Sequence, residues 1–257
     1  MSSTRWLAVP AFLLIVLMLI AVACTEEEDG DTETTPTPSA EDQAEETPAP
    51  QEVTPTPTEE PQPQIEEPES QSLQGAGQEV SDPVVLEEGL TIFRMTHDGA
   101  SNFAIWLLNQ ETGEQLELLV NEIGSFDGAK AVGIVDPGNY VLDVSADGNW
   151  SVTAEQPRPA DAPGPPQTFD GLGQSVSAPF TLNEGLASFT LFHDGSSNFA
   201  IWLIDAQGNL VELLVNEIGP FDGSKAVSVT DDLLAASPGI HFLDIAADGN
   251  WTVTVEQ

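Results

Sequence analysis

The chain has very few basic residues. Five Lys and Arg stand against 43 Asp and Glu in 257 residues, and the formal net charge at pH 7 is −38. A field of this sign repels phosphate backbones and anionic lipid headgroups. The composition therefore excludes nucleic acid as a partner and leaves room for a cation or a cationic partner. An acidic excess is also typical of a solvated protein surface.

Motifs that carry catalysis are missing as well. The chain has no glycine-rich phosphate loop, no GxSxG elbow and no HExxH. Its single cysteine rules out cysteine-based metal spacings. His97, Asp98 and Ser101 lie too close together in one turn to act as base, orienting acid and nucleophile. We therefore expect no enzymatic activity and no cofactor, with calcium as the one ion to consider.

The one cysteine, Cys24, ends an apolar run over residues 6–23 that follows Arg5. A basic residue before an apolar run is typical of an export signal. The ending Ala21-Val22-Ala23-Cys24 resembles a bacterial lipobox, which implies cleavage and a lipid on Cys24. We predict that residues 1–24 are a signal peptide and that Cys24 anchors an exported lipoprotein to the membrane, at the cell surface or in the periplasm. An uncleaved transmembrane anchor is the alternative.

Large apolar side chains are scarce over residues 25–70, a stretch rich in Asp, Glu, Pro and Thr without Lys or Arg. Such a composition cannot bury enough apolar surface to offset the entropy cost of ordering the chain. We predict a disordered acidic stalk, stiffened by proline and by like-charge repulsion. A second proline-rich segment, residues 157–167, is predicted to be a linker.

The most informative feature that is present is internal repetition. Residues 97–107, HDGASNFAIWL, return as residues 193–203 with one change, Ser196 in place of Ala100. The segment ELLVNEIG at 117–124 returns at 212–219, and LDVSADGNW at 142–150 returns as LDIAADGNW at 243–251. Two copies are too few for a solenoid, and each is long enough to close its own core. The sequence therefore predicts two similar domains, repeat 1 at 71–156 and repeat 2 at 168–257.

Each repeat has short apolar runs between turn signals and no helical period. This pattern predicts an all-β fold of two tandem, jelly-roll-like β-sandwiches. In repeat 1 we expect seven strands, near residues 79–86, 90–97, 103–109, 115–121, 129–135, 140–146 and 150–155. Pro83 and its match Pro179 predict an edge position for the first strand. The connection over residues 122–128 is longer than a hairpin requires, so we expect a loop there.

Strand alternation assigns the residues of each strand to the two faces of its sheet. Trp150, Val152 and Ala154 are expected on the core face, and Phe93 and Met95 on the core face of the second strand. His97 and His193 fall on the inward parity at a strand end. They are either hydrogen-bonded residues at the rim of the core or residues with a binding role.

The strand at 103–109 and its counterpart in repeat 2 are apolar on both parities. A sandwich strand normally shows one face to water. The second face, which carries Trp106 and Trp202, is therefore either covered by a loop or the sister repeat, or it is a binding surface. In the second case the two tryptophans would be platforms for sugar rings or for a partner's apolar groups. The candidate binding residues are Trp106, Trp202, His97 and His193.

Turn residues in each repeat also offer oxygen ligands for calcium, which takes roughly six to eight oxygens in proteins. The candidates are Asp98, Asn102 and Asp127 in repeat 1 and Asp194, Asn198 and Asp222 in repeat 2. Their spacing matches no EF-hand loop, and Asp and Asn are common in hairpin turns for conformational reasons alone. The two lysines, Lys130 and Lys225, are expected to pair locally with acidic neighbours.

At the level of architecture, each repeat resembles the exported β-sandwich modules known as pre-peptidase C-terminal domains. The resemblance depends on an F/V-x-L-x-x-G-x-x-x-F opening at 84–93 and 180–189, and on a G-x-Y-x-L-x-V ending at 138–144, where His241 replaces the tyrosine in repeat 2. It implies an accessory module that binds, spaces or targets. We predict a cell-surface lipoprotein that displays two non-catalytic modules for a glycan, cell-wall or protein partner. A spacer without a ligand and a calcium-binding surface module are the alternatives.

Overall fold

The computed structural model describes residues 67–232 and 235–257. The predicted signal peptide, Cys24 and residues 25–66 of the predicted stalk lie outside the described residues. Both repeats belong to a single compact unit of the chain. No helix among the described residues is long and apolar enough to span a membrane.

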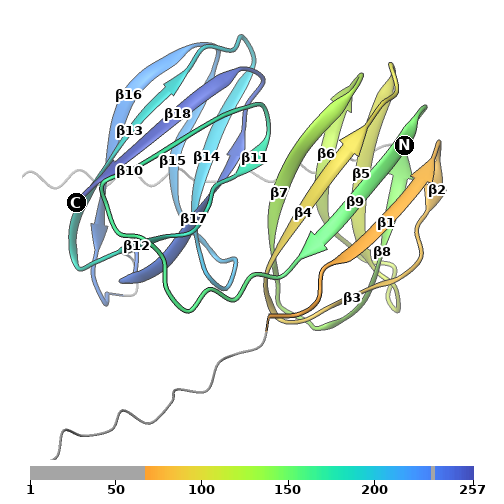
Figure 1. Ribbon diagram of the computed structural model, residues 1–257, viewed down its shortest axis with the longest axis horizontal. Coiled ribbons are helices and arrows are strands. Elements are labelled where there is room, and N and C mark those ends of the chain that lie inside the picture. The colour runs from red at the N-terminus through yellow and green to blue at the C-terminus, as the bar shows by residue number, and fades with distance from the viewer. Residues whose placement is uncertain (1–66, 233–234) are drawn as a thin grey trace, which may run out of the picture. The chain divides into compact units, whose positions relative to one another are not determined.

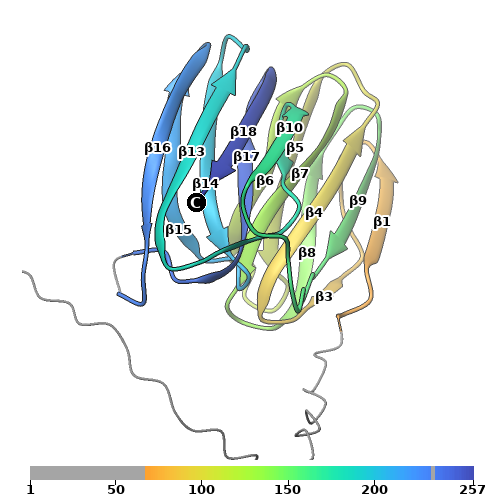
Figure 2. The ribbon, with the colours of Figure 1, turned by 60° about the vertical axis from the view of Figure 1, so that its left-hand side comes forward.

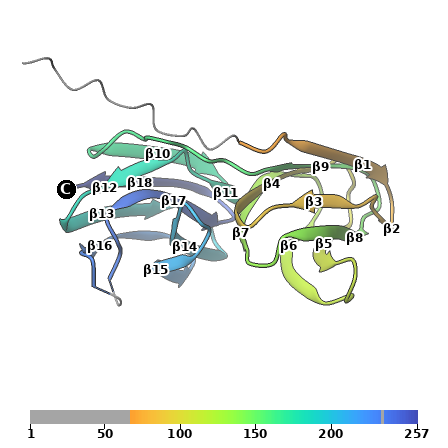
Figure 3. The same cartoon turned by 90° about the horizontal axis from the view of Figure 1, so that it is seen from below.

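Repeat 1 is an antiparallel sandwich of two sheets, which Figure 3 shows as two layers. One sheet has the strand order β1-β9-β4-β7, and the other has the order β2-β8-β5-β6 with β3 also paired to β8. The strands, labelled in Figure 1, are β1 (Gln71–Ala76), β2 (Glu79–Val80), β3 (Val84–Leu86), β4 (Gly89–His97), β5 (Asn102–Asn109), β6 (Gln115–Ile123), β7 (Phe126–Ile134), β8 (Gly138–Ser145) and β9 (Asn149–Glu155).

Repeat 2 has the same topology, with sheet orders β10-β18-β13-β16 and β11-β17-β14-β15 and with β12 paired to β17. Its strands, labelled in Figure 1 and seen from another side in Figure 2, are β10 (Gln167–Leu172), β11 (Ser175–Val176), β12 (Phe180–Leu182), β13 (Gly185–His193), β14 (Asn198–Asp205), β15 (Leu210–Ile218), β16 (Phe221–Val229), β17 (Gly239–Ala246) and β18 (Asn250–Glu256).

This strand order is that of a jelly roll, in which two Greek keys fold over each other to give two four-position sheets. In repeat 1, β2 and β3 share one position beside β8. The predicted all-β fold of two tandem, jelly-roll-like sandwiches is confirmed. Pro83 interrupts the first predicted strand between β2 and β3, and both pieces lie at the sheet edge, as the proline predicted.

The structure corrects two details of the predicted strands. β1 was not predicted, because QSLQGA has a single large apolar residue, Leu73, and a glycine. The predicted loop at 122–128 is wrong. The strands β6 and β7 continue through it and leave only Gly124 and Ser125 between them, with Gly124 at a φ of 101°. This turn crosses from one sheet to the other. Ile123, 75% exposed, pairs with Asn102 of β5, and Phe126 pairs with His97 of β4. Backbone pairing to β5 and β4 therefore extends both strands up to the turn without burial.

The core of each sandwich lies between its two sheets and follows the predicted parity. Phe93, Met95, Phe103, Trp150 and Val152 are all buried in repeat 1. Their counterparts in repeat 2 form a second, separate core cluster. Burial of such a side chain typically contributes about 1.5–3 kcal/mol, so each repeat has a substantial core of its own.

The proline-rich linker contacts both repeats. The Arg158 guanidinium donates hydrogen bonds to the backbone oxygens of Leu90 (3.1 Å) and Glu88 (2.8 Å) of repeat 1. Thr181 of repeat 2 donates through its backbone N–H to the oxygen of Pro163 (3.0 Å). The linker is therefore held against the sandwiches at both of its ends.

Candidate functional site

The two predicted histidines lie inside the sandwiches. His97 is 4% exposed and stacks on Phe103, with ring centroids 4.5 Å apart; His193 is fully buried and stacks on Phe199 at 4.4 Å. The Nδ1 of His97 donates a hydrogen bond to the Gly124 oxygen at 2.7 Å, which fixes the ring against the β6–β7 turn. Both histidines therefore have the packing of core residues at the rim of a sandwich.

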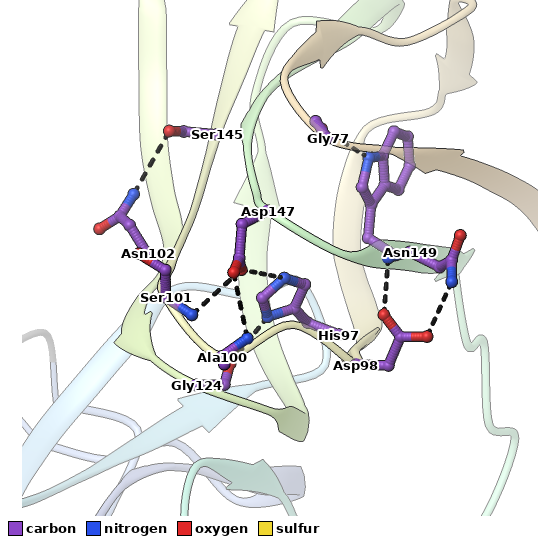
Figure 4. Close-up of polar contacts among 11 residues, drawn as sticks. Gly77, His97, Asp98, Ala100, Ser101, Asn102, Gly124, Ser145, Asp147 and Asn149 are labelled. Atoms are coloured by element: carbon purple, nitrogen blue, oxygen red, sulfur yellow. Dashed lines mark hydrogen bonds and ion pairs between the residues drawn. The ribbon is translucent and has the colours of Figure 1, made fainter.

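The second ring nitrogen of each histidine faces a carboxylate, as Figure 4 shows for His97. The Nε2 of His97 lies 3.4 Å from Oδ1 of Asp147, and the Nε2 of His193 lies 3.3 Å from Oδ1 of Asp248. Neither nitrogen has a partner with hydrogen-bond geometry among the described residues. The Nδ1 hydrogen bond therefore holds the ring, and the approach of Nε2 to the carboxylate does not orient it.

Two aspartates join the turns at this end of repeat 1 reciprocally (Figure 4), and Asp194 and Asp248 do the same in repeat 2. Asp98, in the β4–β5 turn, accepts hydrogen bonds from the backbone N–H (2.7 Å) and the side-chain amide (2.8 Å) of Asn149 in the β8–β9 turn. Asp147, in the β8–β9 turn, accepts from the backbone N–H groups of Ala100 (3.2 Å) and Ser101 (3.1 Å). This reciprocal clamp explains why the HDG and ADGN segments are identical in the two repeats.

The clamp lowers the pKa of both carboxyl groups from the ordinary value of 3.8. For Asp98 the side-chain and backbone hydrogen bonds from Asn149 are the main causes. For Asp147 the backbone N–H of Ser101 is the main cause, opposed by partial desolvation. Hydrogen bonds to the ionised form stabilise it, so both aspartates stay charged well into the acid range.

The candidate calcium ligands do not converge on one point. The carboxylates of Asp98 and Asp194 accept hydrogen bonds from Asn149 and Asn250 in the clamps. Asn102 donates its amide to the Ser145 hydroxyl at 3.3 Å, and Asn198, Asp127 and Asp222 are exposed on strands. Within residues 67–232 and 235–257, no three His, Cys, Asp or Glu side chains are grouped closely enough to hold a metal ion.

The outer face of the β14 sheet in repeat 2 is covered by repeat 1. We call this surface the Trp202 face. Ile204 (1% exposed), Phe242 (1%) and Val176 (7%) pack in one apolar cluster with Leu90 and Ala131 of repeat 1. Trp202 is half-buried against the same cluster. The full Trp202 face comprises Gln174, Val176, Trp202, Ile204, Phe242 and Asp244.

Polar contacts at the Trp202 face cap an edge strand of repeat 1. The Lys130 ammonium donates to Oδ2 of Asp244 at 2.6 Å, and the Ala131 backbone N–H donates to Oδ1 of the same carboxylate at 3.1 Å. Asp244 is only 4% exposed. Gln174 accepts from the Ala129 N–H through its backbone oxygen (3.2 Å) and donates its side-chain amide to the Ala129 oxygen (3.2 Å). Because β7 is the last strand of its sheet, these contacts satisfy backbone groups that an edge leaves without strand partners.

The matching surface of repeat 1 has the same kind of residues and is open. We call it the Trp106 face; it comprises Gln78, Val80, Trp106, Leu108, Val141 and Asp143. Val80 is 63% exposed, whereas its counterpart Val176 is 7% exposed. Trp106, Leu108 and Asp143 are partly exposed. The doubly apolar strand therefore has a covered outer face in repeat 2 and an open outer face in repeat 1.

A groove lies beside the covered face. It has a volume of about 850 Å³ and is lined by Trp202, Ile204, Lys130 and Arg158 among others. Trp202 therefore retains some exposure, although it packs in the contact between the repeats. Trp106 is the predicted binding residue that keeps an open surface around it.

The sequence interpretation missed Asp244 and Gln174, the residues that make the inter-repeat contact polar. The sequence did contain one indication that the Trp202 face is covered. Phe242 has the outward parity on β17, like Trp202 on β14, and its counterpart in repeat 1 is the smaller Val141. An outward phenylalanine next to an outward tryptophan indicates a covered face. The predicted local ion pair is present for Lys225, 2.8 Å from Glu212. Lys130 lies 3.9 Å from the matching Glu117 and makes a shorter contact, 2.6 Å, across the repeats to Asp244.

Comparison with known proteins gives distant structural likenesses. The sequence matches no protein-family model and no curated protein. The chain is similar to the stem and receptor binding domain of the spike protein P1 from bacteriophage PM2, at 10% identity over 76% of this chain and 99% of that one, with a TM-score of 0.16.

Proposed function

We propose that this chain is an exported, membrane-anchored protein that displays two non-catalytic β-sandwich modules and binds a partner protein through the Trp106 face of repeat 1. Export and anchoring depend on the apolar run that ends at Cys24. The clamped turns with His97 and His193 have a structural role in this proposal, and calcium is not needed for them.

The observation that carries the binding proposal is the use of the same face in repeat 2. Val, Trp and Asp occupy identical places on the Trp106 and Trp202 faces, and the Trp202 face holds a protein surface with apolar packing and a buried ion pair. A partly exposed tryptophan beside an exposed valine and an acid is typical of a protein contact site, where Trp is enriched at hot spots.

A protein partner fits the Trp106 face better than a sugar. The covered copy uses its aspartate for a lysine ammonium and a backbone N–H, and its glutamine for backbone groups of a strand edge. These are the donors and acceptors of a polypeptide. The spacer and calcium alternatives assign no role to an open tryptophan at this place.

Site-specific photo-crosslinking in the cells that make the protein tests the proposal. A photoreactive residue replaces Val80 on the Trp106 face or, as the control, Leu172, an equally exposed strand residue off that face (63% and 67% exposed). We expect a discrete protein adduct from position 80 only, and its loss when Trp106→Ala is added.

The same adducts from both positions, or none from position 80, would contradict the proposal. Binding of the purified full chain to a glycan array in a Trp106-dependent way, without a protein adduct, would assign the face to a sugar instead.

A further inference from the structure

The contact between the repeats is head-to-tail, so each repeat has one surface of each kind. The Trp202 face of repeat 2 binds a surface of repeat 1 that we call the Lys130 face, comprising Leu90, Ile92, Ala129, Lys130, Ala131 and Gly133. The matching surface of repeat 2 is the Lys225 face, comprising Leu186, Ser188, Ser224, Lys225, Ala226 and Ser228. A heterologous contact of this kind leaves the Trp106 face at one end and the Lys225 face at the other.

The Lys225 face has lost much of the apolar character of the Lys130 face. Ser188 stands in the place of Ile92, and Ser224 in the place of Ala129. Leu186 is 67% exposed, whereas Leu90 is fully buried. Lys225 is retained, and its ammonium pairs with Glu212 in its own repeat. This face is therefore more polar than the one that makes the contact inside the chain.

A third serine blocks the close approach of backbones. Gly133 lies against Gly208 so closely that a Cβ added at Gly133 would be 2.6 Å from the Gly208 oxygen. The counterpart of Gly133 is Ser228, and the counterpart of Gly208 is Gly113. If the Lys225 face of one molecule docked on the Trp106 face of another in the same way, the Ser228 side chain would meet the Gly113 turn. Self-association through this geometry is therefore opposed by sterics as well as by polarity.

The Trp106 face, in contrast, keeps what is needed to bind a surface like the Lys130 face. Gln78, Val80, Trp106 and Asp143 are identical to their counterparts on the Trp202 face, and Leu108 replaces Ile204. Val141 in place of Phe242 makes the apolar contact shallower. The predicted stalk is a poor occupant, because it has no basic residue to pair with Asp143.

We infer that the Trp106 face binds a β-sheet edge with the chemistry of the Lys130 face, that is, small aliphatic side chains around one lysine and a glycine, carried by another protein. The three serines of the Lys225 face keep copies of this chain from binding one another. This inference rests on the proposed function of the Trp106 face and names the surface that the partner presents. The retained Asp143 sets the specificity, because its carboxylate needs a lysine and a backbone N–H from the partner.

The inference can be tested with this chain as its own probe. The full-chain variant Ser188→Ile, Ser224→Ala, Ser228→Gly gives repeat 2 the three missing features of the Lys130 face. Sedimentation over a wide concentration range should show the wild type as a monomer and the variant as concentration-dependent, head-to-tail oligomers. Adding Asp143→Lys should return the variant to monomers, whereas Asp136→Lys, the same charge change at an exposed turn, should not.

Three other sedimentation results would count against the inference. A folded triple variant that stays monomeric would show that the Trp106 face does not accept such an edge. If the triple change disturbs folding, the double variant Ser224→Ala, Ser228→Gly replaces it. Oligomers that persist with Asp143→Lys would place the contact elsewhere, and a self-associating wild type would contradict the role of the serines. If the position-80 adduct forms while the variant stays monomeric, the face binds a protein of different chemistry and only this inference fails.

Discussion

The Lys130 ammonium and the Asp244 carboxylate meet at 2.6 Å across the two repeats, and the same carboxylate accepts the backbone N–H of Ala131. Asp143, the counterpart of Asp244, is partly exposed. One residue type in one sheet position thus serves as a buried contact in repeat 2 and as an open surface group in repeat 1. The function we propose depends on this difference.

The first prediction concerns this ion pair. Asp244→Asn should lower the free energy of unfolding by about 2 kcal/mol, because it leaves the Lys130 ammonium with only the more distant Glu117 carboxylate, 3.9 Å away. Removing one partner of a fully buried pair costs ~3–5 kcal/mol, and the Lys130 side chain is 23% exposed. Asp143→Asn, the matched change in repeat 1, should have little effect. Denaturant unfolding of the full chain measures both, and equal losses would contradict the assigned roles.

The second prediction separates the two tryptophans. Trp202 packs on the apolar cluster between the repeats, so Trp202→Ala should destabilise the chain by about 3 kcal/mol, at the lower end of the range for buried aromatic truncations. Trp106 packs against none of the core clusters of the described residues, so Trp106→Ala should cost only about 1 kcal/mol. Denaturant unfolding of the two variants tests this, and the reverse order would show that Trp106 is the better packed residue.

The tryptophan strands show what the sequence could and could not predict. Alternation of residues predicted the inner face of each strand and the inward position of His97. Pro83 predicted the edge position of its strand, because proline has no N–H for a second neighbouring strand. Each of these predictions follows from local backbone geometry. Alternation also indicated that the outer faces with Trp106 and Trp202 are either covered, by a loop or the sister repeat, or binding surfaces. It could not predict that repeat 1 covers the Trp202 face and leaves the Trp106 face open, because that contact depends on Lys130 and Asp244, which are distant in sequence.

The third prediction concerns the close backbone contact. Gly133→Ser places in repeat 1 the serine that repeat 2 has at the matching position 228. The Cβ of this serine would be 2.6 Å from the Gly208 oxygen. Overpacking of this kind costs about 1–3 kcal/mol, so the thermal midpoint of unfolding should fall. Gly138→Ala is the control, since an added Cβ there has open space. An unchanged midpoint for Gly133→Ser would mean that the two repeats separate readily.

The fourth prediction concerns acid stability. The folded-state pKa of Asp98 is lowered from 3.8 by its hydrogen bonds to Asn149. The stabilisation from this group is therefore fully present above about pH 4 and is lost as the pH falls through the lowered folded-state pKa. Asp98→Asn should lower stability at neutral pH and flatten its decline in acid. Denaturant midpoints measured across that pH range test this, with the exposed Asp136→Asn as control; a variant with the wild-type acid profile would contradict it.

The fifth prediction concerns the anchor, which lies outside the described residues. Cys24→Ala should release the protein from the membrane fraction or block its processing, because the only cysteine ends the apolar run. Fractionation of producing cells measures this. Unchanged membrane retention, together with a wild-type protein that keeps its apolar segment, would show a transmembrane anchor instead of a lipid.

Oxidative footprinting of the wild-type protein tests the central claim most directly, because it reports the exposure of Trp106 and Trp202 in the same molecule without any substitution. Purified protein and protein on the producing cells are compared. We predict that Trp106 is oxidised readily in the purified protein and is protected on cells, while the oxidation of Trp202 is unchanged between the two samples. Equal oxidation of Trp106 in both samples would show that no partner covers its face and would contradict the proposed function.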